Sequence, residues 1–295
     1  MLKEYLEKKL RYVDEEIKKE LNLIKFPKTI SEGMAYSVLN GGKRLRPILL
    51  LASLEAMGIN FELGIKSAIA IELIHSYSLV HDDLPALDND TYRRGKLTTH
   101  KKFGEAEAIL IGDALLTHAF YILSEKNKKI LKDRQIVDIV SEVAFNSGVN
   151  GMVSGQMIDI ESENKEIDVA TLEYIHKNKT GKLINLPVKI ACIIAEIDRK
   201  TEQHFLEYAN LIGLAFQIKD DILDVESSFE ELGKTVGKDI YENKSTYVSK
   251  FGVEKSKEIL KESVQNAINI LENELKNFDT RILKELALYI VDRKK

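Results

Sequence analysis

Two groups of closely spaced aspartates interrupt segments that are otherwise apolar. The first group ends an almost uncharged stretch and consists of four aspartates within nine residues, Asp82, Asp83, Asp88 and Asp90. The second lies among Leu, Ile, Ala and Phe residues and consists of Asp220, Asp221 and Asp224. Carboxylates in such surroundings repel one another and are costly to bury without compensation. Because Mg²⁺ prefers oxygen ligands, both groups predict sites for a hard divalent cation.

The spacing of the second group places its acids on one side of a helix. At about 100° per residue, a single arc of about 100° contains Gln217, Asp220, Asp221 and Asp224. Lys219 points the opposite way and cannot neutralise these acids. The alternative for this group is a solvated acidic stripe. The alternative for the first group is a helix end whose acids cap the following loop.

Basic residues lie in loops beside both aspartate groups. The segment GGKRLRP at 41–47 joins two predicted helices, and RRG at 93–95 follows the first group directly. HKNKTG at 176–181 opens an apolar stretch, and Lys234 and Lys244 follow the second group. One such segment alone is more often a solvated loop. Together, carboxylates, Mg²⁺ and basic side chains predict a pocket for a polyanion, most simply diphosphate.

Other chemical motifs are incomplete or have a rival interpretation. GKT at 233–235 lacks the first glycine of a phosphate-binding P-loop. Two Glu-x-x-His pairs, Glu72 with His75 and Glu173 with His176, match the ligand spacing of a di-iron helical bundle. That alternative leaves both aspartate groups and the basic loops unexplained.

The elements that position these residues are predicted to be helices. The chain has only 4 prolines and 16 glycines in 295 residues, mostly between periodic segments, and it shows no convincing strand or hairpin pattern. The second predicted helix begins at a Ser31 cap, and the seventh kinks at Pro187. The simplest account is one all-α domain over residues 1–295. The predicted helices are 3–22, 31–40, 47–57, 61–82, 105–125, 131–148, 169–196, 202–225, 252–276 and 280–291.

Composition excludes several classes of protein. Forty-three Lys and Arg residues against 47 Asp and Glu residues give a net charge of −4, so the chain is no polycation for nucleic acid. The single cysteine, Cys192, excludes an internal disulfide framework and a CxxC metal site. The N-terminal segment is densely charged, unlike a secretory signal, and no run approaches the roughly 18 apolar residues of a membrane span. We therefore expect a cytoplasmic protein without a membrane span.

The two aspartate groups and the basic loops together resemble the trans-prenyl diphosphate synthases, and among them the bacterial farnesyl-forming members. The first family motif corresponds to DDLPALD at 82–88 and the second to DDILD at 220–224. GGKRLRP, RRG, GQ at 155–156, HKNKTG, FQ and GK stand in family order. These motifs span residues 41–247, and two aspartate motifs with ordered basic motifs are highly specific.

This resemblance implies an antiparallel helical bundle around a deep central cavity, of the isoprenoid synthase type. It implies head-to-tail condensation of isopentenyl diphosphate with dimethylallyl or geranyl diphosphate, through an allylic carbocation, to give farnesyl diphosphate. About three Mg²⁺ ions per site, replaceable by Mn²⁺, would assist ionisation. A cytoplasmic homodimer with prenyl diphosphates as its ligands is also implied.

The resemblance also implies roles for individual residues. The metal ligands are Asp82, Asp83, Asp88, Asp220 and Asp224. The catalytic residues are Asp82, Asp83, Asp88, Asp220, Asp221, Lys179 and Lys234. The residues that hold isopentenyl diphosphate are Lys43, Arg46, His75 and Arg94. The residues that face the allylic substrate are Arg93, Lys179, Thr180, Gln217, Lys234 and Lys244. We interpret the basic end from Arg293 as a frayed tail, with closure over a bound diphosphate as the alternative.

Product length depends on the residues below the first motif. By the resemblance, Tyr77 acts as the floor of the product pocket, although straight helical geometry places Ser78 more nearly beneath Asp82. If Tyr77 is ordinary core, geranylgeranyl diphosphate becomes the product. Two further alternatives are a non-catalytic partner subunit, which typically lacks one aspartate motif, and a terpene cyclase, which has no need of a second basic loop.

Overall fold

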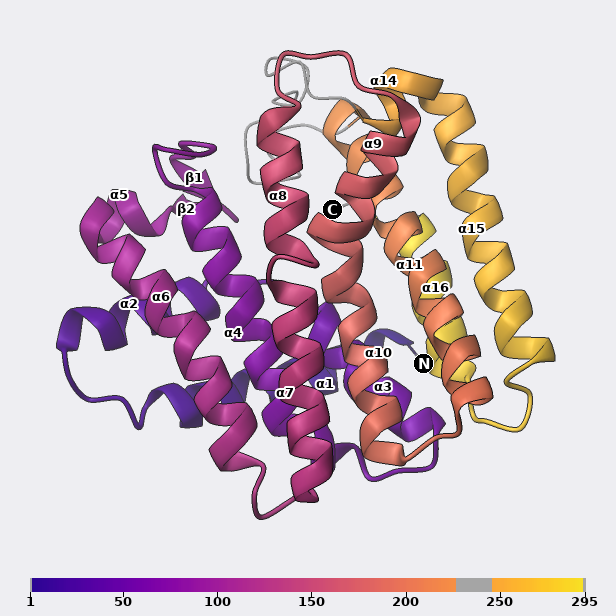
Figure 1. Ribbon diagram of the computed structural model, residues 1–295, viewed down its shortest axis with the longest axis horizontal. Coiled ribbons are helices and arrows are strands. Elements are labelled where there is room, and N and C mark those ends of the chain that lie inside the picture. The colour runs from indigo at the N-terminus through magenta and orange to yellow at the C-terminus, as the bar shows by residue number, and fades with distance from the viewer. Residues whose placement is uncertain (1, 227–245, 294–295) are drawn as a thin grey trace. The chain divides into compact units, whose positions relative to one another are not determined.

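The computed structural model describes residues 2–226 and 246–293 (Figure 1). The chain divides into two compact units, which are described separately. The first contains Met1–Leu51 and Phe61–Val140, and the second contains Ala52–Asn60 and Ser141–Lys295. The expectation of a single domain stays a prediction.

The first unit is built around a helix that is buried on several faces. Helix α4 is made mostly of Ile, Ala, Leu and Ser, which explains why it can pack on more than one side, and α6 packs against it. The elements in and bordering this unit are α1 (Leu2–Leu21), α2 (Lys28–Leu39), α3 (Leu45–Ala56), η1 (Phe61–Gly64), α4 (Ile65–Asp82), β1 (Tyr92–Arg93), β2 (Lys96–Leu97), α5 (Thr99–Phe103), α6 (Glu105–Tyr121), the π-helical turn η2 (Ile122–Lys126) and α7 (Asp133–Ser147).

The second unit centres on its longest helix, α11, which packs against α10, α15 and α16. Buried Phe205, Tyr208 and Ile212 form part of its inner face, and the Tyr208 hydroxyl donates to the Leu283 carbonyl over 2.8 Å. The remaining elements are α8 (Met152–Glu161), α9 (Val169–Ile175), the π-helical segment η3 (His176–Gly181), α10 (Lys182–Ala195), α11 (Arg199–Glu226), α14 (Tyr247–Phe251), α15 (Val253–Asn273) and α16 (Arg281–Asp292).

The all-α prediction is confirmed, with local corrections. Helix α2 begins at Lys28 after Pro27, so Ser31 does not cap it; the Ser31 hydroxyl instead donates to the Lys28 carbonyl inside the first turn. The predicted helix over 169–196 is three elements, because η3 separates α9 from α10. The short helices α5, α8 and α14 were not predicted, and neither was the β1–β2 hairpin.

Two helical segments of the described residues are long and apolar enough to cross a membrane on length and composition alone. The segment Phe61–Asp82 has 72% of its most apolar window buried in the protein, as a core helix does. The segment Glu105–Lys126 has only 39% buried. This second segment exposes the large apolar side chains Ile109, Leu110 and Tyr121.

Candidate functional site

The first aspartate group lies where α4 ends. Asp82 is the last residue of α4, Asp83 caps it, and the backbone N–H of Asp88 folds back to donate to the Asp82 carbonyl over 2.9 Å. Carboxylates at the C-terminus of a helix face the negative end of its dipole. Asp83 is also buried, with 3% of its surface exposed, so this carboxylate needs a nearby cation.

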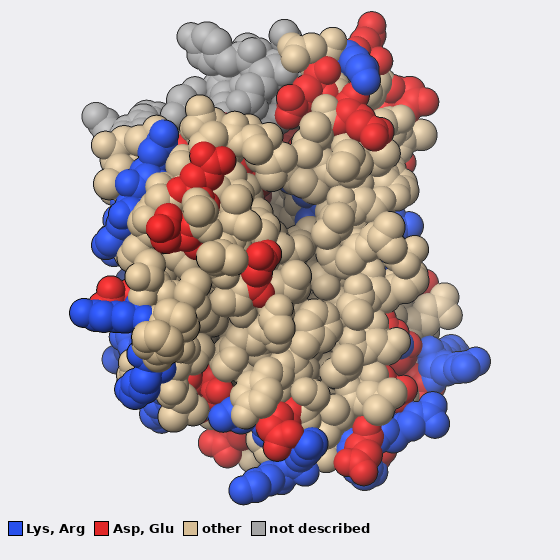
Figure 2. Space-filling view, turned by 60° about the vertical axis from the view of Figure 1, so that its left-hand side comes forward, with Lys and Arg blue, Asp and Glu red and all other residues tan. Residues whose placement is uncertain are grey.

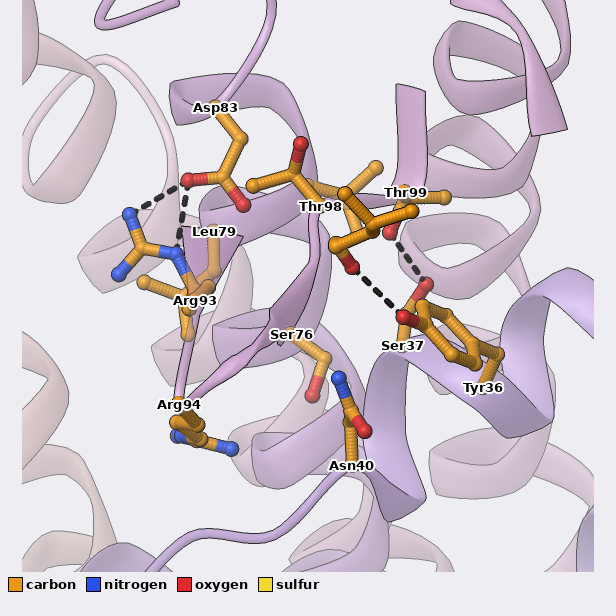
Figure 3. A pocket seen from close by; sticks show the side chains of 12 residues that line it. Tyr36, Ser37, Asn40, Ser76, Leu79, Asp83, Arg93, Arg94, Thr98 and Thr99 are labelled. Carbon is orange, nitrogen blue, oxygen red and sulfur yellow. Dashed lines mark hydrogen bonds and ion pairs between the residues drawn. The ribbon is translucent and has the colours of Figure 1, made fainter. Parts of the chain in front are cut away.

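Arg93 supplies that cation from the neighbouring hairpin. Its Nε and Nη2 atoms lie 2.7 and 2.6 Å from Oδ1 of Asp83 (Figure 3). Burial raises the pKa of Asp83 to about 6, although the charge and hydrogen bonds of Arg93 lower it. The structure thus pairs Asp83, which the resemblance assigned to the metal, with Arg93, which it assigned to the allylic substrate.

The hairpin that presents Arg93 is a minimal antiparallel pair. Tyr92 pairs with Leu97 and Arg93 with Lys96. The two residues between the strands, Arg94 and Gly95, have φ values of 53° and 74°, as a type I′ turn requires. No strand was predicted from the sequence, and the β1–β2 hairpin corrects this locally. Two-residue strands are too short to form an alternating pattern.

Side chains of α2 fasten this hairpin and line a pocket beside it. The Tyr36 hydroxyl donates to the Leu97 carbonyl over 2.6 Å, and the Ser37 and Thr99 hydroxyls lie 2.9 Å apart. Figure 3 shows these contacts together with the Arg93–Asp83 ion pair around one pocket. The lining of this pocket also includes Asn40, Ser76, Leu79, Val80, Arg94 and Thr98.

Four arginines act electrostatically on one histidine of α4. The pKa of His75 is held well below its usual value, first by burial and then by the positive charges of Arg46, Arg94, Arg93 and Arg44. His75 is therefore neutral near pH 7 and can donate or accept a hydrogen bond, but it does not add positive charge. Of the predicted isopentenyl diphosphate ligands, Arg46 and Arg94 act on His75 through their charges, and Lys43 lies in the loop before α3.

The fourth arginine of this cluster was not predicted as a functional residue. Arg44 is buried between α1 and α4, where its guanidinium donates to Asp14 over 2.7 Å and to Glu72 over 2.9 Å. Glu72 stands alone among the apolar residues of α4, and this isolated carboxylate could have indicated a buried cationic partner such as Arg44. Because Glu72 is engaged with Arg44, the structure gives it a role other than iron ligation.

The second aspartate group lies within α11. Asp221 and Asp224 are buried, so a fully solvated acidic stripe is the wrong description. The side chain of Asp221 accepts hydrogen bonds from Gln217 Nε2 over 3.0 Å and from the backbone N–H of Tyr247 over 2.9 Å. The predicted juxtaposition of Gln217 and Asp221 on one helix face is confirmed.

The third acid of this helix face, Asp220, binds an arginine from the end of the chain. Arg293 Nη2 lies 2.5 Å from Asp220 Oδ1 and 2.8 Å from the Phe216 carbonyl, and the guanidinium carbon lies 3.9 Å from the centre of the Phe216 ring. Arg293 is buried rather than frayed, so the interpretation of a frayed tail is wrong for this residue.

The predicted basic segment at 176–181 is the π-helical segment η3. The backbone of η3 lies so close to α8 that a Cβ atom on Gly155 would come within 2.2 Å of the Lys179 nitrogen. Lys179 Nζ donates to Asp159 over 2.6 Å. Such π-helical turns often mark functional positions, and here the wider turn begins at a buried histidine.

That histidine, His176, links η3 to the second aspartate group. Its ring stacks on Tyr247 at 5.3 Å between centroids, and its Nε2 lies 4.0 Å from Asp221 Oδ2. Burial is the main cause that lowers the pKa of His176 to about 4. The histidine is therefore neutral at pH 7. The Glu173–His176 pair, which matched iron-ligand spacing only in the alternative interpretation, thus has its histidine directed towards Tyr247 and Asp221.

The two residues predicted to set product length lie on α4. Tyr77 is buried and meets the ring of His81 edge-on, with 5.5 Å between ring centroids. The Ser78 hydroxyl donates to the His75 carbonyl of the same helix over 2.8 Å. Thr180 lies at the end of η3, whereas Lys234 and Lys244 lie outside the described residues.

The described carboxylates do not form a ready-made metal cage. Within residues 2–226 and 246–293, no three His, Cys, Asp or Glu side chains converge as a metal-binding group. Mg²⁺ commonly uses only one or two carboxylates together with substrate phosphates and water. Each aspartate group nevertheless has a carboxylate that binds a guanidinium, at Asp83 and at Asp220.

The chain is an all-α protein whose fold matches solved isoprenyl synthase structures. The polyprenyl synthetase family model matches residues 27–283, and the chain belongs to this family.

Named relatives cover nearly the whole chain. The farnesyl diphosphate synthase of Micrococcus luteus is 48% identical over 90% of both chains. The geranylgeranyl diphosphate synthase of Cyanophora paradoxa is 44% identical over 90% of this chain and 88% of that protein. The crystal structure of a geranyltransferase from Legionella pneumophila superposes with a TM-score of 0.87 at 32% identity, covering 99% of this chain and 98% of that one.

Proposed function

We propose that this chain is a prenyltransferase that condenses isopentenyl diphosphate with dimethylallyl and then geranyl diphosphate to form farnesyl diphosphate. The main structural support is a pocket lined by Arg93, Arg94 and the buried Asp83, in a part of the chain where the positive charges of arginines lower the pKa of His75. A concentration of guanidinium groups around a hydrogen-bonding side chain suits a diphosphate. The relatedness to farnesyl diphosphate synthases supports the choice of substrate.

In this proposal two arginines of the cluster, Arg46 and Arg94, hold isopentenyl diphosphate. Arg46 and Arg94 supply charge, Lys43 adds a further cation, and His75 supplies a neutral hydrogen bond. Fixing the diphosphate orients the double bond of the substrate for attack on the allylic carbon. Arg46 and Arg94 thus bind one substrate and need not take part in bond cleavage.

The two aspartate motifs provide donors that fit Mg²⁺. Their ligands are hard carboxylate oxygens, and both motifs already hold a cationic side chain, Arg93 at Asp83 and Arg293 at Asp220. Mg²⁺ bound there would stabilise the negative charge that develops on the departing diphosphate. The residues that would hold it are Asp82, Asp83, Asp88, Asp220 and Asp224, with Asp221 held by Gln217 and Tyr247.

The remaining side chains orient the allylic substrate and exclude water. Lys179 and Thr180 of η3, with Arg93 and Gln217, are proposed to face the allylic diphosphate, as are Lys234 and Lys244. The apolar side chains of α4 shield the carbocation from water. The departing diphosphate accepts the proton that is lost after condensation.

The decisive test is incubation with labelled isopentenyl diphosphate and each allylic starter, with and without Mg²⁺, followed by product sizing. We expect Mg²⁺-dependent farnesyl diphosphate from dimethylallyl and geranyl diphosphate. No elongation with any starter would favour a non-catalytic partner subunit. A cyclic hydrocarbon would favour a terpene cyclase.

Product length is proposed to depend on Tyr77. The buried ring of Tyr77, braced by His81, supports its role as a floor, whereas the relatedness to a geranylgeranyl diphosphate synthase keeps the longer product as the second candidate. Tyr77→Ala should lengthen the product on chromatography, and Tyr77→Phe should preserve it. An unchanged product from Tyr77→Ala would remove Tyr77 from this role.

We further propose a cytoplasmic homodimer that uses the exposed face of α6. Ile109, Leu110 and Tyr121 of this helix are exposed large apolar side chains, and uncharged residues predominate across the middle of the face in Figure 2. Apolar patches of this kind favour association. Light scattering coupled to size exclusion should give a dimer mass, and Leu110→Glu should shift it towards the monomer.

A further inference from the structure

The guanidinium of Arg94 rests on a backbone made of two glycines. Gly41 and Gly42 have φ values of 94° and 126°, and Arg94 Nη1 donates to the Gly41 carbonyl. A Cβ atom on Gly42 would lie 2.6 Å from Nη1, 2.8 Å from Cζ and 3.0 Å from Nη2 of Arg94. The guanidinium therefore occupies the space that any side chain at position 42 would need.

A second guanidinium donates to the same carbonyl. Arg44 Nη1 donates to the Gly41 carbonyl over 3.2 Å, and its Nη2 donates to the Val38 carbonyl over 2.7 Å. Arg44 has a φ of 52°, which is unfavourable for a residue other than glycine. Its contacts with Asp14 and Glu72 compensate for this conformation by fixing the side chain between α1 and α4.

The two arginines differ in what balances their charge. Arg44 is buried and faces the carboxylates Asp14 and Glu72, so it is not available to a ligand. Arg94 is exposed, and no carboxylate of the described residues lies within ion-pairing distance of it. Desolvation by the surrounding atoms, with the charges of Arg44 and Arg93, lowers its pKa. An anion beside Arg94 would relieve that repulsion.

We propose that Gly42 and Arg44 are positioning residues that seat Arg94 for the diphosphate of isopentenyl diphosphate. Gly42 leaves room for the guanidinium, and Arg44 fixes the Gly41 carbonyl to which Arg94 donates. Neither positioning side chain contacts the substrate. The inference rests on the proposed function, because it assigns the homoallylic diphosphate to this part of the first unit.

Gly42→Ala tests the seat directly, and Gly58→Ala is its matched control. Both positions have positive φ, but a Cβ atom on Gly58 would meet no heavy atom within 4 Å. We expect Gly42→Ala to raise the KM for isopentenyl diphosphate about tenfold, with kcat and the KM for geranyl diphosphate changed by less than about threefold. Gly58→Ala should leave all three parameters unchanged. Equal effects of the two variants would overturn the proposal.

A double-mutant cycle distinguishes an effect of Gly42 on the position of Arg94 from a general loss of structure. If Gly42 acts through Arg94, Gly42→Ala should raise the KM for isopentenyl diphosphate in the wild-type background and have no further effect after Arg94→Ala. Additive effects of Gly42→Ala and Arg94→Ala on this KM would show that Gly42 does not act through Arg94.

Asp14→Asn addresses Arg44 without removing a buried cation. Asp14 accepts from Arg44 Nε at 2.7 Å, so this substitution should loosen Arg44 and raise the same KM about threefold. Asp138→Asn, which alters the exposed pair with Arg134, is the control and should leave this KM unchanged. An unchanged KM in Asp14→Asn would exclude Arg44 as a positioning residue.

A binding measurement keeps this inference distinct from the proposed reaction. Calorimetric titration with inorganic diphosphate in the absence of Mg²⁺ should show weaker binding to Gly42→Ala than to the wild type and to Gly58→Ala. If wild-type protein forms no prenyl product but this difference persists, the proposed function fails and the anion seat stands. If product forms and the difference is absent, the seat fails alone.

Discussion

The two aspartate motifs each pair one carboxylate with an arginine, but they bury opposite partners. In the first unit Asp83 is the buried member, with 4% of its side chain exposed, and Arg93 is the more open one at 27%. In the second unit Arg293 is buried at 3%, whereas 43% of the Asp220 side chain is exposed. Burial penalises whichever charge is removed from water, so the desolvation cost falls on Asp83 in the first pair and on Arg293 in the second.

This difference separates a constrained motif from a more accessible one. Asp83 sits at the negative end of α4 and depends on Arg93, which comes from a hairpin only ten residues away. Asp220 lies on the open side of α11 and meets Arg293, 73 residues later in the chain. A cation can approach Asp220 from solvent with little desolvation of that carboxylate, whereas Asp83 is enclosed by protein.

The largest effect on stability is expected in the buried charges that support the first motif. Arg44→Met leaves Glu72 buried without its guanidinium and should lower the free energy of unfolding by about 3–5 kcal/mol. Urea denaturation of the metal-free protein measures this change. A loss no larger than that of Arg293→Gln would show that the first unit does not depend more strongly on buried ion pairs.

A slightly smaller effect, on catalysis, should fall equally on both motifs. Asp82→Asn and Asp220→Asn should each reduce kcat by about 10²–10³-fold at saturating substrates, because each removes a charged oxygen donor for the divalent metal. Steady-state assays over a range of Mg²⁺ concentrations measure this loss. Near-normal kcat in one variant alone would restrict the reaction to the other motif.

Acidification should affect the two units in opposite directions. The pKa of Asp83 is raised from 3.8 to about 6 in the folded protein, so folded Asp83 binds protons that the unfolded chain does not, and lowering the pH from 6 to 4 favours folding. The pKa of His176 is lowered from 6.5 to about 4, so the unfolded chain binds the extra proton and the same change favours unfolding.

Single substitutions can separate these opposing contributions. Asp83→Asn should make the loss of stability between pH 6 and 4 steeper by about 2–3 kcal/mol, and His176→Asn should make it shallower by a similar amount. Guanidinium denaturation at several pH values, without metal, measures both slopes. Curves parallel to that of the wild type would contradict the burial of these two groups.

The smallest effect is expected at the C-terminal arginine. Arg293→Gln should lower the free energy of unfolding by about 1 kcal/mol, because Asp220 stays hydrated and the main loss is packing against Phe216. Thermal denaturation measures this change, with Arg281→Gln at an exposed pair as the control. A loss as large as that of Arg44→Met would show that the exposed carboxylate of Asp220 depends on its guanidinium as strongly as the buried carboxylate of Glu72 does.

Much of the fold follows from the sequence because long helices leave periodic patterns. The predicted helices at 3–22 and 202–225 correspond closely to Leu2–Leu21 and Arg199–Glu226. The β1–β2 hairpin and the π-helical segment η3 left no such pattern, since both are shorter than the window in which periodicity can be recognised. Yet η3 contains Lys179, and the hairpin contains Arg93, so local irregularities hold predicted site residues.

The sequence by itself determined the chemical inventory: acids on apolar helices, basic loops beside them, and a helical chain to hold both. It did so because carboxylates in apolar segments are costly and therefore conspicuous. Only the tertiary structure decided which charges meet. Arg44 reaches Asp14 and Glu72, and Arg293 reaches Asp220, across separations that no local spacing rule spans. Long-range packing brings such partners together, and it also decides which member of each pair loses its water.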